Sequence, residues 1–200
     1  MDRVGIIARY AAMMAALPYA TGDMAAILLK DGGRCYMTDD FSDFRDIKPV
    51  DILDVTDFPL PEKDALMRLS ECGAMILFKT PYAGICVDSG HPVRASLDDM
   101  AQIVGSCAEV CPRDAAKICG ALRSSYAVLI DRRHAVCVGR NLYEAYTALT
   151  VLEKQAEVML KAAVIGGARP LSAAECALMR AVYKRKYSKA EKEFKDDSEG

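Results

Sequence analysis

Histidine is scarce in this sequence: its 200 residues include only two, His91 and His134. Imidazole is the side chain that most often binds catalytic zinc, and such sites commonly use two or three of them. Two histidines cannot form a three-histidine zinc site within one chain, whatever the alignment. Zinc would have to be held by other ligands, such as thiolates.

The eight cysteines do not have the spacing of a zinc site. Their tightest group, Cys107, Cys111 and Cys119, lacks the two-residue gaps of structural zinc ligands. Most of the others lie inside apolar runs, such as residues 85–87 and 136–138, where a reduced thiol packs as a small hydrophobe. We therefore expect buried, reduced cysteines and no metal site.

Long hydrophobic runs and an excess of one charge are also missing. No run reaches the roughly 18 apolar residues of a membrane span, and the first residues lack the basic head and cleavage site of a secretory signal. The 26 basic and 28 acidic residues give a formal net charge of -2, too little to attract nucleic acid or an anionic membrane. We expect a cytoplasmic protein with neither as a partner.

The residues that are present predict one globular α/β domain over residues 1–185, followed by a charged tail over 186–200 that frays from the last helix. The Lys30–Gly33 segment predicts a hairpin turn, because glycine tolerates positive φ. Apolar periodicity, caps and turn residues predict helices at 3–17, 61–72, 96–104, 112–122, 141–165 and from 172, and strands at 24–29, 34–38, 50–55, 74–78, 106–110, 126–130 and 135–138.

Several segments in the same order resemble the class II aldolase/adducin family. Residues 128–145, followed by Leu-Glu-Lys-Gln-Ala at 152–156, resemble the family's strand, Asn-His-Gly turn, second strand and helix. Residues 80–83, Thr-Pro-Tyr-Ala, resemble the Ser-Pro-Tyr-Ala that follows its His-x-His motif, and residues 99–105 fit the segment downstream. The resemblance implies a three-layer αβα fold with a central, mainly antiparallel sheet, and a homo-oligomer, commonly a tetramer.

Family members bind Zn²⁺ through three histidines, and the metal polarises the substrate carbonyl. The resemblance puts Leu77 and Lys79 at the two His-x-His positions, where neither side chain can bind zinc. Counting back from Gly139 puts Arg133 at the third position, and a shift of one residue puts His134 there. We therefore expect no metal and no other cofactor.

The family's proton-transferring carboxylate has a counterpart in Glu62, which is equally explained as an acid that stabilises the start of a helix. The substrate-binding positions correspond to Gly22, Asp23, Thr38, Thr80 and Tyr82. Carboxylates at residues 23, 39 and 40 would repel a phosphate dianion by about 1 kcal/mol or more per close pair. The resemblance therefore implies a small carbonyl or carboxylate ligand rather than a sugar phosphate.

Lys79 and Arg133 would place two cations in the space that zinc occupies in the family. We hypothesise that they bind a small carboxylate or pair with Glu62; alternatively, both point into solvent, or Lys79 forms a Schiff base with a carbonyl substrate. The sequence favours a binding or regulatory protein without zinc-dependent aldolase activity. The alternatives are an active carbon-carbon lyase or epimerase that uses substituted residues or an atypical metal site, and a subunit that stabilises a catalytic relative.

Overall fold

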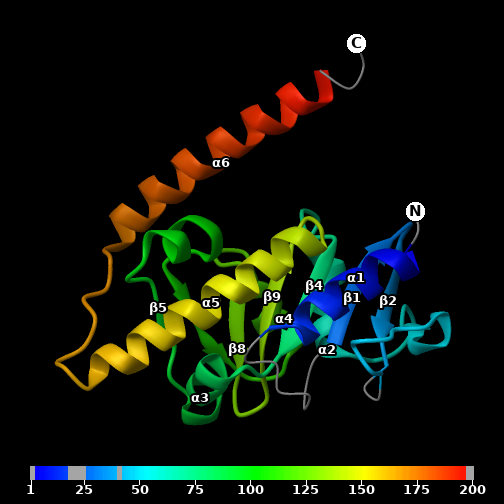
Figure 1. Cartoon of the computed structure of the whole chain (residues 1–200), viewed down its shortest axis with the longest axis horizontal. Coiled ribbons are helices and arrows are strands. Elements are labelled where there is room, and N and C mark those ends of the chain that lie inside the picture. The colour runs from blue at the N-terminus through cyan, green and yellow to red at the C-terminus, as the bar shows by residue number, and fades with distance from the viewer. Residues whose placement is uncertain (1–2, 18–25, 40–41, 197–200) are drawn as a thin grey trace.

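A seven-stranded sheet forms the centre of the molecule in the computed structural model (Figure 1). The structure describes residues 3–17, 26–39 and 42–196, and the side chains of the last helix only at residues 173–183 and 185. Every neighbouring pair in the sheet is antiparallel except the parallel pair β7–β8. In spatial order the strands are β3 (Ile52–Asp54), β2 (Arg34–Thr38), β1 (Ala26–Asp31), β4 (Ala74–Phe78), β9 (His134–Gly139), β8 (Ala127–Ile130) and β7 (Val110–Cys111).

The predicted hairpin joins β1 to β2. Gly32 and Gly33 both have positive φ, 58° and 81°, and Asp31 pairs with Arg34 across the two-residue turn. Only residues without a Cβ adopt two successive left-handed conformations at little cost. The hairpin prediction is confirmed.

Helices cover both faces of the sheet and make three layers. α1 (Arg3–Ala15), α3 (Pro81–Ser89) and α5 (Leu142–Ala163) pack on one face, and α2 (Pro61–Arg68) and α4 (Ala115–Leu122) on the other. Along the fully buried strand β4, Ile76 and Phe78 enter the first core, and Met75 and Leu77 enter the second. A strand covered on both faces has no polar side, as its continuous apolar sequence predicts. The expected three-layer architecture is confirmed.

Several element boundaries differ from the prediction. α2 ends at Arg68 rather than near residue 72, because the backbone turns extended at Leu69, with φ -89° and ψ 98°. The Lys30 ammonium donates to the Leu69 carbonyl at 2.9 Å. The helix predicted at 96–104 includes a π-helix, η2 (Met100–Val104).

The strand predicted at 106–110 is two short strands. β6 (Cys107–Ala108) pairs with β5 (Val93–Arg94) in a separate sheet, whereas β7 joins the main one. The predicted strand is divided because its two halves pair with different strands. A 3-10 turn, η1 (Pro49–Asp51), precedes β3 within the strand predicted at 50–55.

The last helix, α6 (Ala173–Asp196), leaves the body of the molecule and points away from it (Figure 1). The Ser172 hydroxyl accepts from the Glu175 amide, and the Glu175 carboxylate accepts from the Ser172 amide, which confirms the predicted capping box. The helix is held by Arg180, whose guanidinium donates to the Val104 carbonyl and lies 4.6 Å from the Tyr126 ring centre. The boundary predicted after residue 185 falls inside α6, which continues to Asp196.

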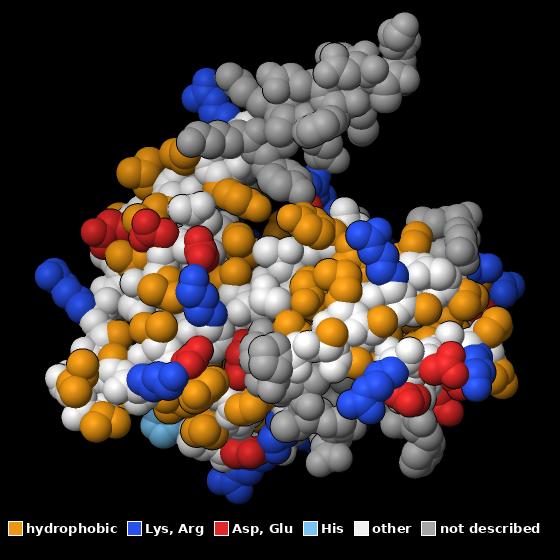
Figure 2. Space-filling view, viewed as in Figure 1, with side chains coloured by type: hydrophobic (Ala, Val, Ile, Leu, Met, Phe, Trp, Pro, Cys, Tyr) orange, Lys and Arg blue, Asp and Glu red, His pale blue; other side chains and the backbone are white. Residues whose placement is uncertain are grey.

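The surface features agree with the low net charge. On the face seen in Figure 2, acidic and basic side chains are interspersed, and neither sign covers a large area. None of the helices among the described residues is long and apolar enough to cross a membrane. The eight cysteines are unpaired thiols, and burial raises the pKa of Cys35 and Cys86 to about 11.

Candidate functional site

A cavity of about 1150 Å³ lies where β1 and β9 begin and β4 ends, at one end of the strands of the main sheet. The strand register explains why side chains from distant segments meet there: Ala26 at the start of β1 lies opposite Leu77 near the end of β4, and Ile130 at the end of β8 lies opposite His134 at the start of β9. The volume is of the size that small-molecule sites have. This cavity is therefore the candidate site.

Leu77 and Lys79 both line the cavity. The Leu77 side chain is apolar and 9% exposed. The Lys79 ammonium forms an ion pair with the Asp88 carboxylate at 2.6 Å, from the end of β4 to α3. The two positions that correspond to the His-x-His motif thus contain an aliphatic group and an ion-paired ammonium.

Glu62 lies at the start of α2, fully buried beside two cationic or basic groups. Arg113 donates from Nε to Oε1 at 2.7 Å and from Nη2 to Oε2 at 3.0 Å. His134 Nε2 lies 3.2 Å from Oε1. The expected pairing of Glu62 with Lys79 or Arg133 is therefore corrected: an arginine from the β7–α4 connection forms the pair, because the fold places residue 113 beside residue 62.

The charge of Glu62 is set by opposing effects. Burial on its own would raise the pKa of this carboxyl, but the contacts with His134 and Arg113 outweigh it and lower the pKa to about 2. The His134 contact is within ion-pair distance but is not aligned as a hydrogen bond, so we regard the bidentate Arg113 pair as the stronger cause. Glu62 is a carboxylate at neutral pH.

The His134 ring is the least satisfied polar group at the site. It is 4% exposed, and within the described part of the chain neither ring nitrogen has an aligned hydrogen-bond partner; the same is true of Ser42 Oγ, which also lines the cavity. Buried polar atoms of native proteins are normally bonded, so such exceptions need an explanation. These atoms are therefore candidate contacts for a ligand in the cavity.

The structure brings both candidates for the third ligand position to the cavity. Arg133 is exposed in the turn that precedes β9, whereas His134 is the first, buried residue of the strand. Arg132 in the same turn has a positive φ of 54°. The other histidine, His91, is exposed in the segment between α3 and β5, with Nδ1 3.0 Å from the Ser89 carbonyl oxygen.

The structure places the predicted substrate-binding residues in different surroundings. Thr38 is fully buried, and its hydroxyl accepts from the Ile27 amide at 3.0 Å, a bond within the β1–β2 hairpin. The Tyr82 ring lies 5.5 Å from Lys161 Nζ. Gly22 and Asp23 lie outside the described residues.

Thr80 lines the cavity, but its hydroxyl donates to Glu153 Oε2 at 2.5 Å. The Glu153 carboxylate also accepts from the amides of Tyr82 and Ala83, at 3.0 and 2.8 Å. A buried carboxylate of α5 thus satisfies the first turn of α3. This contact gives the Leu-Glu-x-x-Ala segment a structural role beside the site.

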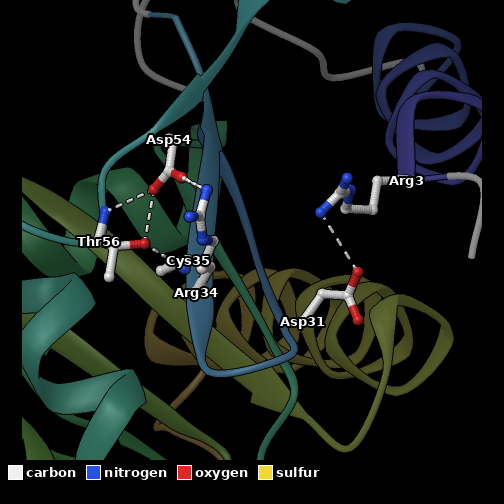
Figure 3. A network of polar contacts seen from close by, with 6 residues as sticks. All are labelled: Arg3, Asp31, Arg34, Cys35, Asp54 and Thr56. Atoms are coloured by element: carbon white, nitrogen blue, oxygen red, sulfur yellow. Dashed lines mark hydrogen bonds and ion pairs between the residues drawn. The ribbon is translucent and has the colours of Figure 1, made fainter.

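The β2–β3 side of the cavity carries three carboxylates, of Asp39, Asp43 and Asp54, and one guanidinium, of Arg45. Asp54 lines it and accepts from Arg34 at 3.1 Å and from the Thr56 hydroxyl at 2.6 Å (Figure 3). Hydrogen bonds from Thr56 are the main cause of a lowered pKa at Asp54. The Thr56 hydroxyl in turn accepts from the Cys35 amide at 3.0 Å, so this wall is fixed to β2.

The residues at the cavity do not fit a zinc ion. Leu77 has no lone pair, Lys79 is in an ion pair, and Glu62 is already bound by Arg113. Across residues 3–17, 26–39 and 42–183, no three His, Cys, Asp or Glu side chains are grouped as metal ligands. His134 is the imidazole that the cavity offers.

Sequence reasoning missed Arg113 and the capping role of Glu153. Arg113 follows Pro112 in a connecting segment, and its bond with Glu62 spans 51 residues. No local spacing indicates such a pair. Glu153 did lie in a segment that carried the resemblance, but its three acceptor contacts depend on where α3 begins.

Comparison with known proteins identifies the fold. An L-fuculose 1-phosphate aldolase superposes with a TM-score of 0.82 over 92% of this chain and 97% of that one, at 19% identity. YgbL from Escherichia coli superposes with a TM-score of 0.71 at 20% identity, covering 87% and 95%. The L-fuculose-1-phosphate aldolase of Thermus thermophilus gives 0.68 at 18%, covering 83% and 97%.

No family model and no curated protein sequence matches the chain. At the identities found, the structural likeness establishes the architecture alone. The chain has the mixed α/β fold of the class II aldolases, with their central, mainly antiparallel sheet. The chemistry of its site has to be argued from its own residues.

Proposed function

We propose that this protein is a divergent member of the class II aldolase/adducin family that binds a small organic carboxylate and lacks zinc-dependent aldolase activity. The observation that carries the proposal is the His134 ring, buried without an aligned partner among the described residues beside a cavity lined by Lys79, Arg113 and Arg133. A binding protein of this kind would serve a regulatory or scaffold role.

The charges in the cavity favour a carboxylate over a phosphate dianion. Arginine binds a planar carboxylate with two parallel hydrogen bonds, and Arg133 lines the cavity from an exposed turn. Asp39 and Asp43 line the same cavity, and each close contact with a dianion would cost on the order of 1 kcal/mol or more. A singly charged carboxylate suffers less of this repulsion.

Thermal shift and calorimetry with a panel of organic acids test the proposal, together with zinc analysis of the purified protein. We expect some carboxylates to raise the melting temperature, Arg133→Gln to weaken that effect, and zinc to be substoichiometric. Arg123→Gln, at the end of α4 and exposed, is the matched control and should bind normally. Stoichiometric zinc, or no response to any acid, would overturn the proposal.

A second candidate function is a carbon-carbon lyase or epimerase that acts on a small carbonyl substrate without the usual histidines. The contact between the buried Glu62 carboxylate and His134 favours it, because adjacent carboxylate and imidazole groups at a cavity can move a proton. Hydrogen–deuterium exchange at carbons next to the carbonyl of small hydroxyketones, followed by NMR, tests this function. Exchange that is lost in Glu62→Gln would establish it.

A Schiff base at Lys79 is the remaining covalent alternative. The Lys79 nitrogen is held in an ion pair with Asp88 at 2.6 Å, and the ammonium of an ion pair is not nucleophilic. Borohydride treatment with candidate aldehydes and ketones, followed by mass spectrometry, would trap the adduct. We expect no added mass at Lys79.

We also propose a homo-oligomer, a tetramer by the resemblance, and a cytoplasmic location. Light scattering on the purified chain measures the first, and fractionation of cells that express it tests the second. A role as a subunit that stabilises a catalytic relative predicts co-purification with a histidine-containing homologue. A monomeric mass in solution would contradict the proposed tetramer.

A further inference from the structure

Charges of opposite sign line opposite ends of the cavity. Asp39 directly follows β2, and Asp43 lies in the connection from β2 to β3. Lys79 follows β4, and Arg133 immediately precedes β9. Arg45 lies in the same connection as Asp43 and also lines the cavity, but with Asp54 the acids there outnumber it three to one. The β2–β3 end of the cavity is therefore net acidic, and the β4–β9 end is net cationic.

The order of the strands gives the scale of this separation. From β2 to β9 the sheet runs through β1 and β4, which is three strand spacings, or about 14 Å. The acidic and basic side chains reach into the cavity from both ends. The two charged groups of a ligand that contacts them would therefore lie less than about 14 Å apart. A ligand that touches both ends must be elongated.

The middle of the cavity is apolar, and the polar atoms without aligned partners are divided between the ends. Ala26 of β1 and Leu77 of β4 are paired across the two strands between β2 and β9, and both line the middle of the cavity. Among the described residues, Ser42 Oγ lacks a partner on the acidic side and both ring nitrogens of His134 lack one on the cationic side. Each end therefore has a polar group that a ligand would satisfy.

We infer that the ligand is an elongated zwitterion, with its carboxylate at Arg133 and His134 and an ammonium group at Asp39 and Asp43. The inference rests on the proposed function, because it names the class of carboxylate that the site selects. An ammonium supplies three hydrogen-bond donors, which Ser42 Oγ and the two carboxylates would accept. The methylene chain between the charges would pack on Ala26 and Leu77.

Calorimetry with a matched set of compounds tests the inference: ε-aminocaproate carries both charges, hexanoate only the carboxylate, and hexylamine only the ammonium. We expect ε-aminocaproate to bind about fivefold more tightly than hexanoate, the ratio that one ion pair of ~1 kcal/mol gives. Glycine is too short to reach both ends, so it should bind no more tightly than acetate. Hexylamine should bind more weakly than either of the six-carbon acids.

Substitutions of the two aspartates test where the ammonium group of the ligand binds. Asp39→Asn and Asp43→Asn should each reduce the preference for ε-aminocaproate over hexanoate towards equality while hexanoate still binds. Asp46→Asn is the matched control, since Asp46 lies in the same connection but is paired with Lys48 on the surface at 3.4 Å. Melting curves identify any variant that fails to fold, and the second aspartate keeps the test valid if one does.

The outcomes separate this inference from the proposed function. Equal affinity for ε-aminocaproate and hexanoate in the unmodified protein overturns the inference and leaves a carboxylate-binding protein. A preference that survives both aspartate variants also overturns it. Failure of every carboxylate and zwitterion to bind overturns the proposed function as well.

Discussion

Replacing Glu62 with glutamine removes the negative charge from the most buried ion pair of the site. The Glu62 side chain is fully buried, whereas the Arg113 side chain is 34% exposed. Glutamine keeps the size of the side chain but offers one acceptor oxygen where the carboxylate offers two. The variant therefore loses one of the two bonds from Arg113 and the attraction between the charges.

The lowered pKa gives the size of the effect. Glu62 is shifted from 4.5 to about 2 in the folded protein, and each unit corresponds to about 1.4 kcal/mol, so ionisation stabilises the fold by about 3 kcal/mol. Because the folded-state pKa is depressed, this contribution is complete above pH 4.5 and is lost as the pH falls towards 2. We expect Glu62→Gln to be less stable by about 3 kcal/mol at pH 7.

Urea unfolding at pH 7 and at several acidic pH values measures the free energy of unfolding of both proteins. The difference between them should shrink towards zero as the pH is lowered, since the unmodified protein then carries a neutral Glu62. Glu71→Gln, at an exposed position after α2, controls for general charge effects and should differ little at any pH. Equal stability at pH 7, or a difference that does not change with pH, would refute the reasoning.

Three further variants test contacts around the site by the same unfolding measurement. Glu153→Gln should lose about 2 kcal/mol, because an amide cannot accept every bond that Thr80 and the α3 amides now donate; a loss equal to that of an exposed Glu→Gln would contradict this. Lys30→Met should lose about 1 kcal/mol with the bond to the Leu69 carbonyl, and no loss would mean that water replaces it. Gly139→Ala should lose about 2 kcal/mol, because the new Cβ would lie 2.6 Å from the Ala145 nitrogen; unchanged stability would show that α5 can shift.

The main sheet was predictable because its signals are local. The two glycines after Asp31 favour the hairpin turn in any context, and the apolar run at residues 74–78 has no polar face to expose. α3 was missed because its stability comes from elsewhere. Gly84 weakens the helical pattern, and the carboxylate that binds its first turn lies about 70 residues further along.

The site was only partly predictable for the same reason. Glu62, Lys79, Arg133 and His134 were all singled out from the sequence, and all four lie at or beside the cavity. The one pairing suggested among them, of Glu62 with Lys79 or Arg133, was wrong, because which cation meets a buried carboxylate depends on how the elements fold together. The resemblance indicated candidate positions, but it gave no information about Arg113, which lies outside the segments that carried it.

A double variant, Leu77→His with Lys79→His, tests whether the fold still supports the family's metal geometry. Phe78 lies opposite Ala135 across β4–β9, so the same register places residue 79 opposite residue 134, where facing Cβ atoms are about 5 Å apart. Residue 77 projects from the same side of β4, because alternate residues share a face. With His134 these substitutions supply three imidazoles at one end of the cavity, enough for a zinc site with an open position.

We expect the double variant to retain about one zinc per chain after dialysis, and adding His134→Ala to remove it. Adding Arg133→Ala instead should leave the zinc content unchanged, since an exposed guanidinium contributes no lone pair. If Arg133 is the true counterpart of the third ligand, zinc will bind only when histidine replaces it, and His134 will be dispensable. That result would move the ligand position to the turn before β9 and would leave the buried His134 ring, in contact with Glu62, as a feature of this protein's own ligand site.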